Sequence, residues 1–459
     1  MLHLVSHPES NDAGRKPIGP ATLLFCLLFL PGTGFSSTGA TPEFSVPASY
    51  PLSTEELVAE ALANNLELRS YEAELAAARG ERRQAGMWKN PELEGTYAYR
   101  RVSDPQEILV GEGVSRGLAI VQTFEFPGKG SLRKAMADQN IRLAELGVQQ
   151  FRQALAGQIR SLSIQWVLLS ENAQATAELS ERSQALLHLL EARPIAGPVK
   201  LLEFRAIQGS LTELHFTARD LRQRQEEIRI QLNSLLGRPP QQEFRMREEI
   251  GTPAFPIGDI PAFMATGEGN NLQLRMRNLE VERAAKALNA AELEMAPDFK
   301  VGPYFSQETA GEDAINVGGV LAMTLPLWDW NQGGIDTARA RQEKAHWLKQ
   351  DAARQVRMTI YQRIRAYTLA REHLEATPKR DIILLGQSAG LADRQYRTGG
   401  AGIQLLLEVQ RQYLAALRTR NESLLEAWQS WLDLDLLTAG ACLPVRQAQP
   451  SLPAKSTVP

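Results

Sequence analysis

The segment Asn64-Asn-Leu-Glu-Leu-Arg69 recurs as Asn270-Asn-Leu-Gln-Leu-Arg275, at an offset of 206 residues (270 − 64). Pro91 recurs at the same offset as Pro297. A third match has an offset of 205 (402 − 197) and joins Gly197-Pro-Val-Lys-Leu-Leu-Glu203 to Gly402-Ile-Gln-Leu-Leu-Leu-Glu408. Several matches in one order at a nearly constant offset indicate a tandem duplication.

The duplication divides the chain into two repeats. We place the first at residues 41–237 and the second at residues 263–440, joined by the proline-rich linker 238–262. In each repeat a helix rich in Ala, Glu and Arg precedes two strand-like segments. These first helices are expected at Thr54 to Ala85 and at Leu272 to Met295. Long helical stretches then flank a glycine-containing turn.

The long helical stretches carry the apolar spacing of a coiled coil. Steps of four and three residues run through the first repeat at Leu155, Ile159, Leu162, Trp166, Leu169 and Ala173. Similar stripes follow at Leu214, Ala218, Leu221, Ile228, Leu232 and Leu235, and at Leu406, Tyr413, Leu417, Leu424, Ala427, Trp431 and Leu434. A helix from Leu132 to Leu190 would reach on the order of 90 Å. The stripes alone also fit a plain antiparallel coiled-coil hairpin.

The strand-like segments alternate between an apolar and a milder face. One face is formed in the first segment by Leu93, Gly95, Tyr97 and Tyr99, and in the last by Ile315, Val317, Gly319, Leu321, Met323 and Leu325. We expect β-hairpins at about 91–126 and 298–327, with polar loops at Val102 to Ser115 and Gln307 to Ala314. Each segment is near the ~9 to 11 residues that a tilted strand needs to cross a bilayer.

Four strands are too few to close a barrel, and lipid does not tolerate their unpaired edges. The economical arrangement is several subunits that each contribute four strands. Since the chain after residue 40 offers no long apolar stretch, a membrane location would require such a closed β-barrel. The alternative is a pair of surface hairpins on a soluble protein.

The two ends of the chain are expected to lie outside the repeats. Residues 1–40 have the order of a secretory signal peptide: Arg15 and Lys16 precede an apolar run that small residues follow up to Ala40, the expected cleavage site. The run is shorter than the roughly 20 residues of a transmembrane helix. A buried N-terminal helix is the alternative. Residues 441–459 are expected to form a flexible tail.

Composition disfavours several classes of function. Lys and Arg number 50 against 53 Asp and Glu, so the chain has no excess of positive charge that would favour a nucleic-acid partner. The two cysteines are Cys26, in the segment expected to be removed, and Cys442, so neither a disulfide nor a thiolate metal site is expected. With no phosphate-binding loop or nucleophile motif, we expect no enzyme activity, no cofactor and no metal site.

Three stretches carry a resemblance to a known family. They are Ala85-Gly-Met-Trp-Lys-Asn-Pro-Glu-Leu93, Gln122-Thr-Phe-Glu-Phe-Pro-Gly-Lys129 with Arg133 beyond it, and Tyr396-Arg-Thr-Gly399 leading into Leu405-Leu-Leu-Glu408. Together with the duplicated order of elements, they resemble the TolC-type outer-membrane efflux family over roughly Leu52 to Gly440. The first two look most like its CzcC-type branch, whose systems are associated with heavy-metal export.

The resemblance implies a mainly α fold with a membrane β-barrel. Three subunits would form a 12-strand barrel continued by a long α-helical coiled-coil barrel in the periplasm. This homotrimer in the bacterial outer membrane would passively conduct substrates, heavy-metal cations in this branch, to the exterior as part of a tripartite efflux system. Its partners would be a periplasmic membrane-fusion adaptor, an inner-membrane RND-type pump and outer-membrane lipid. The alternative is a periplasmic adaptor or coiled-coil scaffold without a pore.

The resemblance also implies site residues at the two helix turns. Gly197 and Pro198 would form one turn, and Gly399 and Gly402 the other, with Tyr396 and Arg397 beside it at the adaptor-docking surface. The alternative is that these glycines serve only to reverse the direction of the chain.

Glu408 matches an acidic position that the family places just past the second turn, and Glu203 is its repeat equivalent. Threefold symmetry would convert one carboxylate into a ring that attracts cations. Leu405 stands where some relatives have a second acid. A solvated glutamate on a helix surface is the alternative for Glu408. Nearby Asp393, Arg394 and Arg397 could latch neighbouring helices by ion pairs, or could form an ordinary solvated face.

Overall fold

The computed structural model describes residues 51–192, 197–246, 250–253, 260–310 and 313–440. These residues fall within one contact unit, Ala48–Pro459. The expected signal peptide, the expected tail and parts of the expected linker lie outside the described residues. Across the described ranges, every helix is too short or too polar to cross a membrane.

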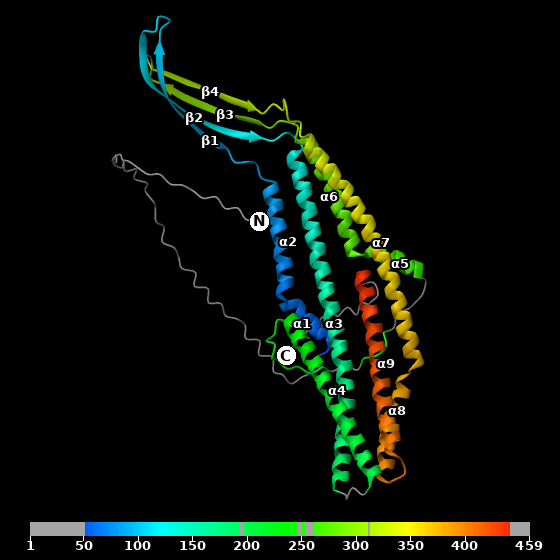
Figure 1. Cartoon of the computed structure of the whole chain (residues 1–459). Coiled ribbons are helices and arrows are strands. Elements are labelled where there is room, and N and C mark those ends of the chain that lie inside the picture. Colours follow the sequence, from blue (N-terminus) through cyan, green and yellow to red (C-terminus); the bar gives the residue numbers. More distant parts are fainter. Residues whose placement is uncertain (1–50, 193–196, 247–249, 254–259, 311–312, 441–459) are drawn as a thin grey trace, which may run out of the picture. The chain divides into compact units, whose positions relative to one another are not determined.

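The chain is mainly helical, and its four strands occur as two pairs that lie together in space (Figure 1). The first part contains α1 (Thr54–Asn64), α2 (Leu66–Ala85), β1 (Glu92–Ser103), β2 (Leu109–Phe124), α3 (Lys129–Glu191) and α4 (Pro198–Leu236). The second contains α5 (Ile260–Asn270), α6 (Leu272–Leu293), β3 (Phe299–Glu308), β4 (Ala314–Met323), α7 (Gln332–Ala376), α8 (Lys379–Arg397) and α9 (Ile403–Leu437). Helix α5 thus begins two residues before the expected end of the linker.

The single helix expected from Thr54 to Ala85 is wrong, because the chain breaks at Asn65 between α1 and α2. The buried side chain of Asn65 accepts a hydrogen bond from the Leu68 backbone N–H (2.9 Å), which caps α2. Its amide donates to the Leu235 carbonyl at the end of α4 (3.0 Å). One side chain therefore starts a short helix and holds the end of a long one.

The same two hydrogen bonds recur at Asn271, which is also buried. It accepts from the Leu274 backbone N–H (3.0 Å) and donates to the Leu437 carbonyl at the end of α9 (2.9 Å). The recurring Asn-Asn-Leu segment is thus the joint between a long helix and the short helix that leads to the strands.

Helix α3 runs for 63 residues without a break, or about 95 Å. Its counterpart in the second part is interrupted at Pro378, between α7 and α8. Proline lacks a backbone N–H and displaces the preceding residue from helical geometry, and Thr377 accordingly has φ −126° and ψ 71°.

The core consists of separate clusters along the helices, because α3 changes neighbours along its length. Leu155, Ile159 and Leu162 pack with residues of α1 and α4, including Leu57 and Leu232. Further along, the buried residues of α3 lie on a second stripe that faces α7, α8 and α9: Ile164, Leu168, Ala175 and Leu186. Trp166 and Leu169 of the expected stripe are only partly buried. The expected stripe on α9 is buried at Leu406, Leu417, Leu424, Ala427, Trp431 and Leu434.

The four strands form one antiparallel sheet in the order β1-β2-β3-β4. The two hairpins pair through β2 and β3, where Leu118 lies opposite Phe305. The polar loop expected at Val102 to Ser115 is mostly strand. The actual turn is short, because the Asp104 carboxylate accepts hydrogen bonds from the backbone N–H groups of Gln106 (3.0 Å) and Ile108 (2.8 Å).

One face of this sheet carries exposed apolar side chains on all four strands, with Arg101, Glu112, Arg116 and Gln307 on the same face nearer the hairpin turns. The register places these exposed side chains on it: Leu93, Tyr97, Tyr99, Leu118, Ile120, Val301, Phe305, Val317, Leu321 and Met323. The opposite face carries polar and small residues, such as Thr96, Ser306 and Asn316. Within the described residues, β1 and β4 each pair with one neighbour only, so each has a free edge.

Candidate functional site

Two helix turns lie at the same end of the helices, α3 to α4 and α8 to α9 (Figure 1). A small apolar cluster holds the four helices together there, with one buried residue from each: Leu186, Ile207, Ala392 and Leu406. The sequence-predicted site residues therefore gather in one region, which we call the helical tip.

The backbone conformation of the second turn accounts for the glycine that ends the stretch Tyr396-Arg-Thr-Gly399. Gly399 has φ +82°, a left-handed conformation that glycine adopts without strain. Its backbone N–H donates to the Tyr396 carbonyl (3.1 Å), and the Gly400 N–H donates to the Gln395 carbonyl (2.8 Å). These two bonds form a Schellman motif that ends α8. Gly402 precedes α9 with an ordinary extended backbone (φ −84°), so the backbone there does not require glycine.

At the first turn, Gly197 has φ +93° and is followed by Pro198 in the first turn of α4. Proline suits that position because its missing N–H would have no partner within the helix. The sequence-predicted turn residues thus stand at the two chain reversals.

A hydrogen bond links α8 to α4 beside the turns. The Tyr396 hydroxyl donates to Glu203 Oε2 (3.3 Å), and the same oxygen lies 3.1 Å from Lys200 Nζ. Burial, followed by the negative charge and hydrogen bond of Glu203, raises the pKa of Tyr396 to about 12. The tyrosine hydroxyl therefore stays protonated, and able to donate, throughout the physiological range.

Arg397 links α8 to α3. Its Nε donates to Asp393 Oδ2 (3.0 Å), and its terminal guanidinium nitrogen donates to the backbone carbonyl of Arg182 (3.4 Å). Asp393 is buried, and its other carboxylate oxygen accepts no hydrogen bond from the described residues. Arg394 is exposed.

Glu408 lies apart from these contacts on an exposed part of α9. Its carboxylate accepts a hydrogen bond from Gln412 of the same helix (2.7 Å). Leu405, one turn earlier, is 56 % exposed. Glu203 has a different setting, because its side chain is only 20 % exposed and is engaged by Lys200 and Tyr396. The two sequence-predicted acids are therefore not equivalent in the folded subunit.

A second cluster of charges, which sequence reasoning did not identify as a site, lies where the strands meet the helices. Arg133 donates to both carboxylate oxygens of Glu125 (2.8 and 2.9 Å), and Lys129 donates to Asp298 (3.0 Å). Lys89 lies 3.7 Å from Glu125 and 3.6 Å from Asp298. Lys89, Glu125, Lys129 and Arg133 occur in or beside the quoted stretches Ala85 to Leu93 and Gln122 to Lys129, and Asp298 follows the recurring Pro297.

The electrostatics of this junction favour its charged form. The hydrogen bond from Arg133 is the main cause that lowers the pKa of Glu125. Burial alone would raise the pKa of Asp298, but hydrogen bonds from Lys129 and the Phe126 backbone N–H outweigh it, so that pKa is lowered. The junction therefore ties β1, β2 and β3 to the start of α3 by ionised groups.

Across the residues that the structure describes, His, Cys, Asp and Glu side chains form no group of three that could hold a metal ion.

The fold is that of solved outer-membrane channels. CmeC of Campylobacter jejuni superimposes with a TM-score of 0.69 at 15 % identity, over 84 % of this chain and 85 % of that one. CusC gives 0.68 at 15 % identity over 84 % and 92 %, and MtrE of Neisseria gonorrhoeae gives 0.66 at 14 % identity over 84 % and 89 %. At these identities the likeness establishes the architecture.

The sequence itself matches one family model. Residues 57–238 match outer membrane efflux protein, a segment that begins in α1 and ends just after α4. A search of curated proteins finds no match to the chain.

Proposed function

We propose that this chain is the outer-membrane channel subunit of a tripartite efflux system, which passively conducts substrates from a pump and an adaptor to the exterior. The family match over residues 57–238 and the fold shared with outer-membrane channels support this proposal. The recurring bonds of Asn65 and Asn271 support a tandem duplication as the origin of the subunit. The channel carries out no catalysis.

The sheet is the observation that carries the proposal. An apolar face that stays exposed over four strands is costly in water and suits lipid, while the polar face suits a water-filled interior. Free backbone groups on β1 and β4 must be paired before such a sheet can enter lipid. Three copies of a four-strand sheet close a 12-strand barrel and leave no edge.

Aromatic residues support the same placement. Trp88 precedes β1, and Trp328 and Trp330 follow β4, so all three lie at the helix-facing end of the sheet. They are 73 %, 91 % and 52 % exposed. Tryptophan is favoured where lipid headgroups meet water. We therefore place the inner boundary of the membrane at this level and the helices in the periplasm.

The helical tip is then the periplasmic entrance, where the adaptor of an RND-type pump docks on the turns at Gly197, Pro198, Gly399 and Gly402. The bonds of Tyr396 and Arg397 hold α8 against α4 and α3, so they keep the entrance narrow in the resting trimer. Docking that separates these helices would release them.

The exposed Glu408 forms a ring of three carboxylates at the entrance and favours cations. Together with the CzcC-like stretches Ala85 to Leu93 and Gln122 to Lys129, this supports heavy-metal cations as the cargo. Deleting the chain and screening sensitivity to metals and to drugs tests the cargo directly. Sensitisation to drugs alone would rule out metal cations.

The gate assignment is tested in planar bilayers with the full trimer. We expect Glu408→Gln to reduce the preference for cations over anions, with Glu422→Gln on the same helix as the control. We expect charge reversal at Arg397 to raise basal conductance. Unchanged ion preference and unchanged leak would remove both residues from the gate.

A periplasmic adaptor or scaffold without a pore is the second candidate, since coiled-coil helices alone would serve it. It does not require a sheet with an exposed apolar face. Cell fractionation separates the two: recovery as a detergent-resistant trimer in the outer membrane supports the channel, whereas a soluble periplasmic product excludes it.

A further inference from the structure

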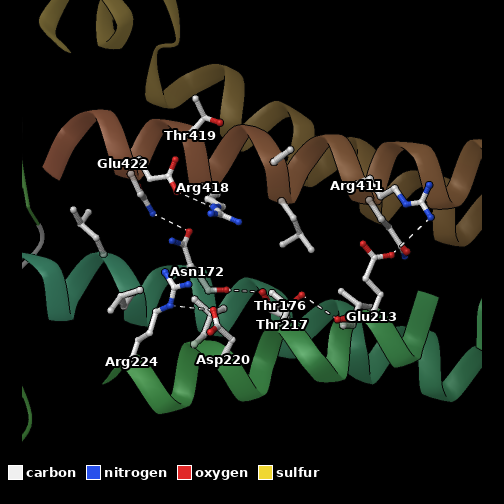
Figure 2. Close-up of a pocket in the computed structure, with 18 of the residues that line it drawn as sticks. Asn172, Thr176, Glu213, Thr217, Asp220, Arg224, Arg411, Arg418, Thr419 and Glu422 are labelled. Carbon is white, nitrogen blue, oxygen red and sulfur yellow. Dashed lines mark hydrogen bonds and ion pairs between the residues drawn. The ribbon is translucent and has the colours of Figure 1, made fainter. Parts of the chain in front are cut away.

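A pocket of about 540 Å³ lies between α3, α4 and α9 (Figure 2). Its α4 residue nearest the helical tip, Ser210, is seven positions beyond Glu203, or roughly 10 Å along the helix. On α9 the lining begins at Gln410, two positions beyond Glu408, so the pocket adjoins the proposed entrance on that helix but does not include the turns themselves.

The pocket is apolar inside. Leucines from all three helices line it: Leu168, Leu169, Leu214, Leu221, Leu414 and Leu425. Its volume falls in the range of ~300 to 1,000 Å³ that is usual for sites of drug-sized ligands. A helix about 10 Å wide would fill 540 Å³ with little more than one turn. The pocket thus fits a small molecule better than a partner helix.

Charged residues at the mouth are balanced in number and sign. The α4 side presents Glu213 and Asp220, and the α9 side presents Arg411 and Arg418, each pair spaced by seven residues (Figure 2). Arg224 and Glu422 complete a set of three acids and three bases. A balanced mouth gives no net attraction to an ion of either sign.

One weak ion pair crosses the mouth. Glu213 and Arg411 lie 3.7 Å apart, and both side chains are 63 % exposed. A pair so exposed contributes little to stability, so an entering molecule can displace it easily.

Two amides among the pocket-lining residues of α9 have buried carbonyl oxygens without a partner in the described part of the chain. Gln410 is 4 % exposed and Asn421 is 2 % exposed, and neither side-chain carbonyl oxygen accepts a hydrogen bond from the described residues. The Asn421 amide nitrogen is already used, because it donates to Glu171 (3.1 Å) and to the Asn172 side chain (3.1 Å). Buried acceptors without a partner are costly, and a ligand N–H or O–H would recover that cost.

The nearby hydroxyl groups point to the same ligand chemistry. Thr176 donates to the Asn172 carbonyl (2.8 Å), and Thr217 donates to the Glu213 carbonyl (3.0 Å). Their protons are committed to their own helices, so both hydroxyl oxygens act toward a ligand as acceptors.

We propose that this pocket is a binding site for uncharged, drug-sized apolar compounds that carry an N–H or O–H donor. The leucines bury the apolar body, and the side chain of Gln410 or Asn421 turns its amide oxygen toward the donor. The site goes beyond the proposed channel function, because it depends only on the packing of α3, α4 and α9.

The test uses the full chain in lipid nanodiscs and the fluorescent probe N-phenyl-1-naphthylamine, which is aromatic, uncharged and has one N–H. We expect a saturable fluorescence component above the linear background from lipid. Thr217→Trp fills the pocket from an exposed position, so the fold should tolerate it, and it should weaken binding at least about tenfold. Leu369→Trp, on an exposed part of α7 outside the pocket, should not change binding.

The donor requirement is tested with Gln410→Leu, which removes an acceptor that has no partner and so should not unfold the chain. We expect the variant to bind the probe about fivefold more weakly. Its affinity for 1-phenoxynaphthalene, in which oxygen replaces N–H, should match that of the unchanged chain in competition. Absence of a saturable component, or equal probe binding by Thr217→Trp and the unchanged chain, would overturn the site. Equal loss for both compounds would overturn the role of Gln410.

Discussion

Tyr396 shows how one side chain at the helical tip responds to pH. Its pKa is raised to about 12, first by burial and then by Glu203. The hydroxyl keeps its proton more tightly in the folded chain than in the unfolded chain, where the pKa is 10.0. The contribution of Tyr396 to stability is therefore fully present below pH 10 and is lost as pH rises from 10 to about 12.

The difference in absorbance at 295 nm between the unchanged chain and Tyr396→Phe should show one tyrosine that ionises near pH 12. Glu203→Gln should shift that ionisation downward, because it removes the negative charge. Tyr361→Phe, at a position that is 51 % exposed, is the control and should leave the ionisation near pH 12 in place. If Tyr396→Phe removes no ionisation near pH 12, the hydrogen bond to Glu203 is contradicted.

Asn65 and Asn271 are expected to contribute equally to stability, since each makes the same two hydrogen bonds. Replacing either by Ala should lower the free energy of unfolding by about 2 kcal/mol, from a lost helix cap and an unsatisfied buried carbonyl. The preceding residues, Asn64 and Asn270, are exposed and provide matched controls. Denaturant unfolding of the four Ala variants would measure this, and equal effects at 64 and 65 would refute the capping role.

The sequence predicted where these asparagines matter but not what they do. Their recurrence at a fixed offset is visible in the chain, and their capping bonds are local. The bonds from Asn65 to Leu235 and from Asn271 to Leu437 join residues more than 160 positions apart. Periodicity in a sequence does not reveal contacts between residues so far apart. The ionic junction around Lys89 and Asp298 was not predicted for the same reason.

At Gly302 the backbone of β3 lies directly against the backbone of β2. A Cβ atom there would collide with the carbonyl oxygen of Ile120. The paired residues between β2 and β3 skip this point, resuming at Ala119 with Tyr304 and at Gln122 with Val301. Pro303, which has no N–H to donate, follows directly. The glycine therefore allows a proline-containing strand to remain in the middle of the sheet.

We expect Gly302→Ala to destabilise the sheet by about 3 kcal/mol, because the backbone of β2 or β3 must move apart. Gly95→Ala is the control, since a Cβ at position 95 meets nothing within 4 Å. The temperature at which the detergent-resistant oligomer dissociates would measure the difference between the two variants. Similar temperatures for both would show that the close approach at Gly302 can relax without cost.

Periodicity predicted the types of most elements but not their ends. The α9 stripe was identified correctly because one face of that helix stays buried along most of its length. The stripe predicted on α3 matches the buried residues only in part. That helix packs against different helices along its length, so no single seven-residue pattern describes its buried face. Charged residues such as Arg101 and Glu112 were read as loop, although they pair across β1 and β2. Both lie on the face that carries Tyr97 and Tyr99, near the hairpin turn, so charged residues there do not mark a loop.

The whole subunit is incomplete at two edges of its sheet. β1 and β4 each have one partner in the described residues, and the intervening strands are paired on both sides. In the proposed trimer, β1 of one copy pairs with β4 of the next, so the same contact is used three times around a closed ring. This arrangement predicts which strands come together between subunits.

Cysteine pairs on these two edges provide the test, in a chain whose Cys442 is replaced by Ser. Ala98 on β1 lies on the polar face, as do Asn316, Gly318, Val320 and Ala322 on β4. We combine Ala98→Cys with a cysteine at each of the four in turn, because subunit register is set only on closure. At least one pair should form disulfide-linked dimers and trimers in isolated outer membranes, and each single variant should not. Ala98→Cys with Ser115→Cys, which lie opposite each other in one hairpin, should link only within a subunit. If none of the four pairs links subunits while the hairpin pair forms, the edges are not joined between copies and the barrel proposal fails.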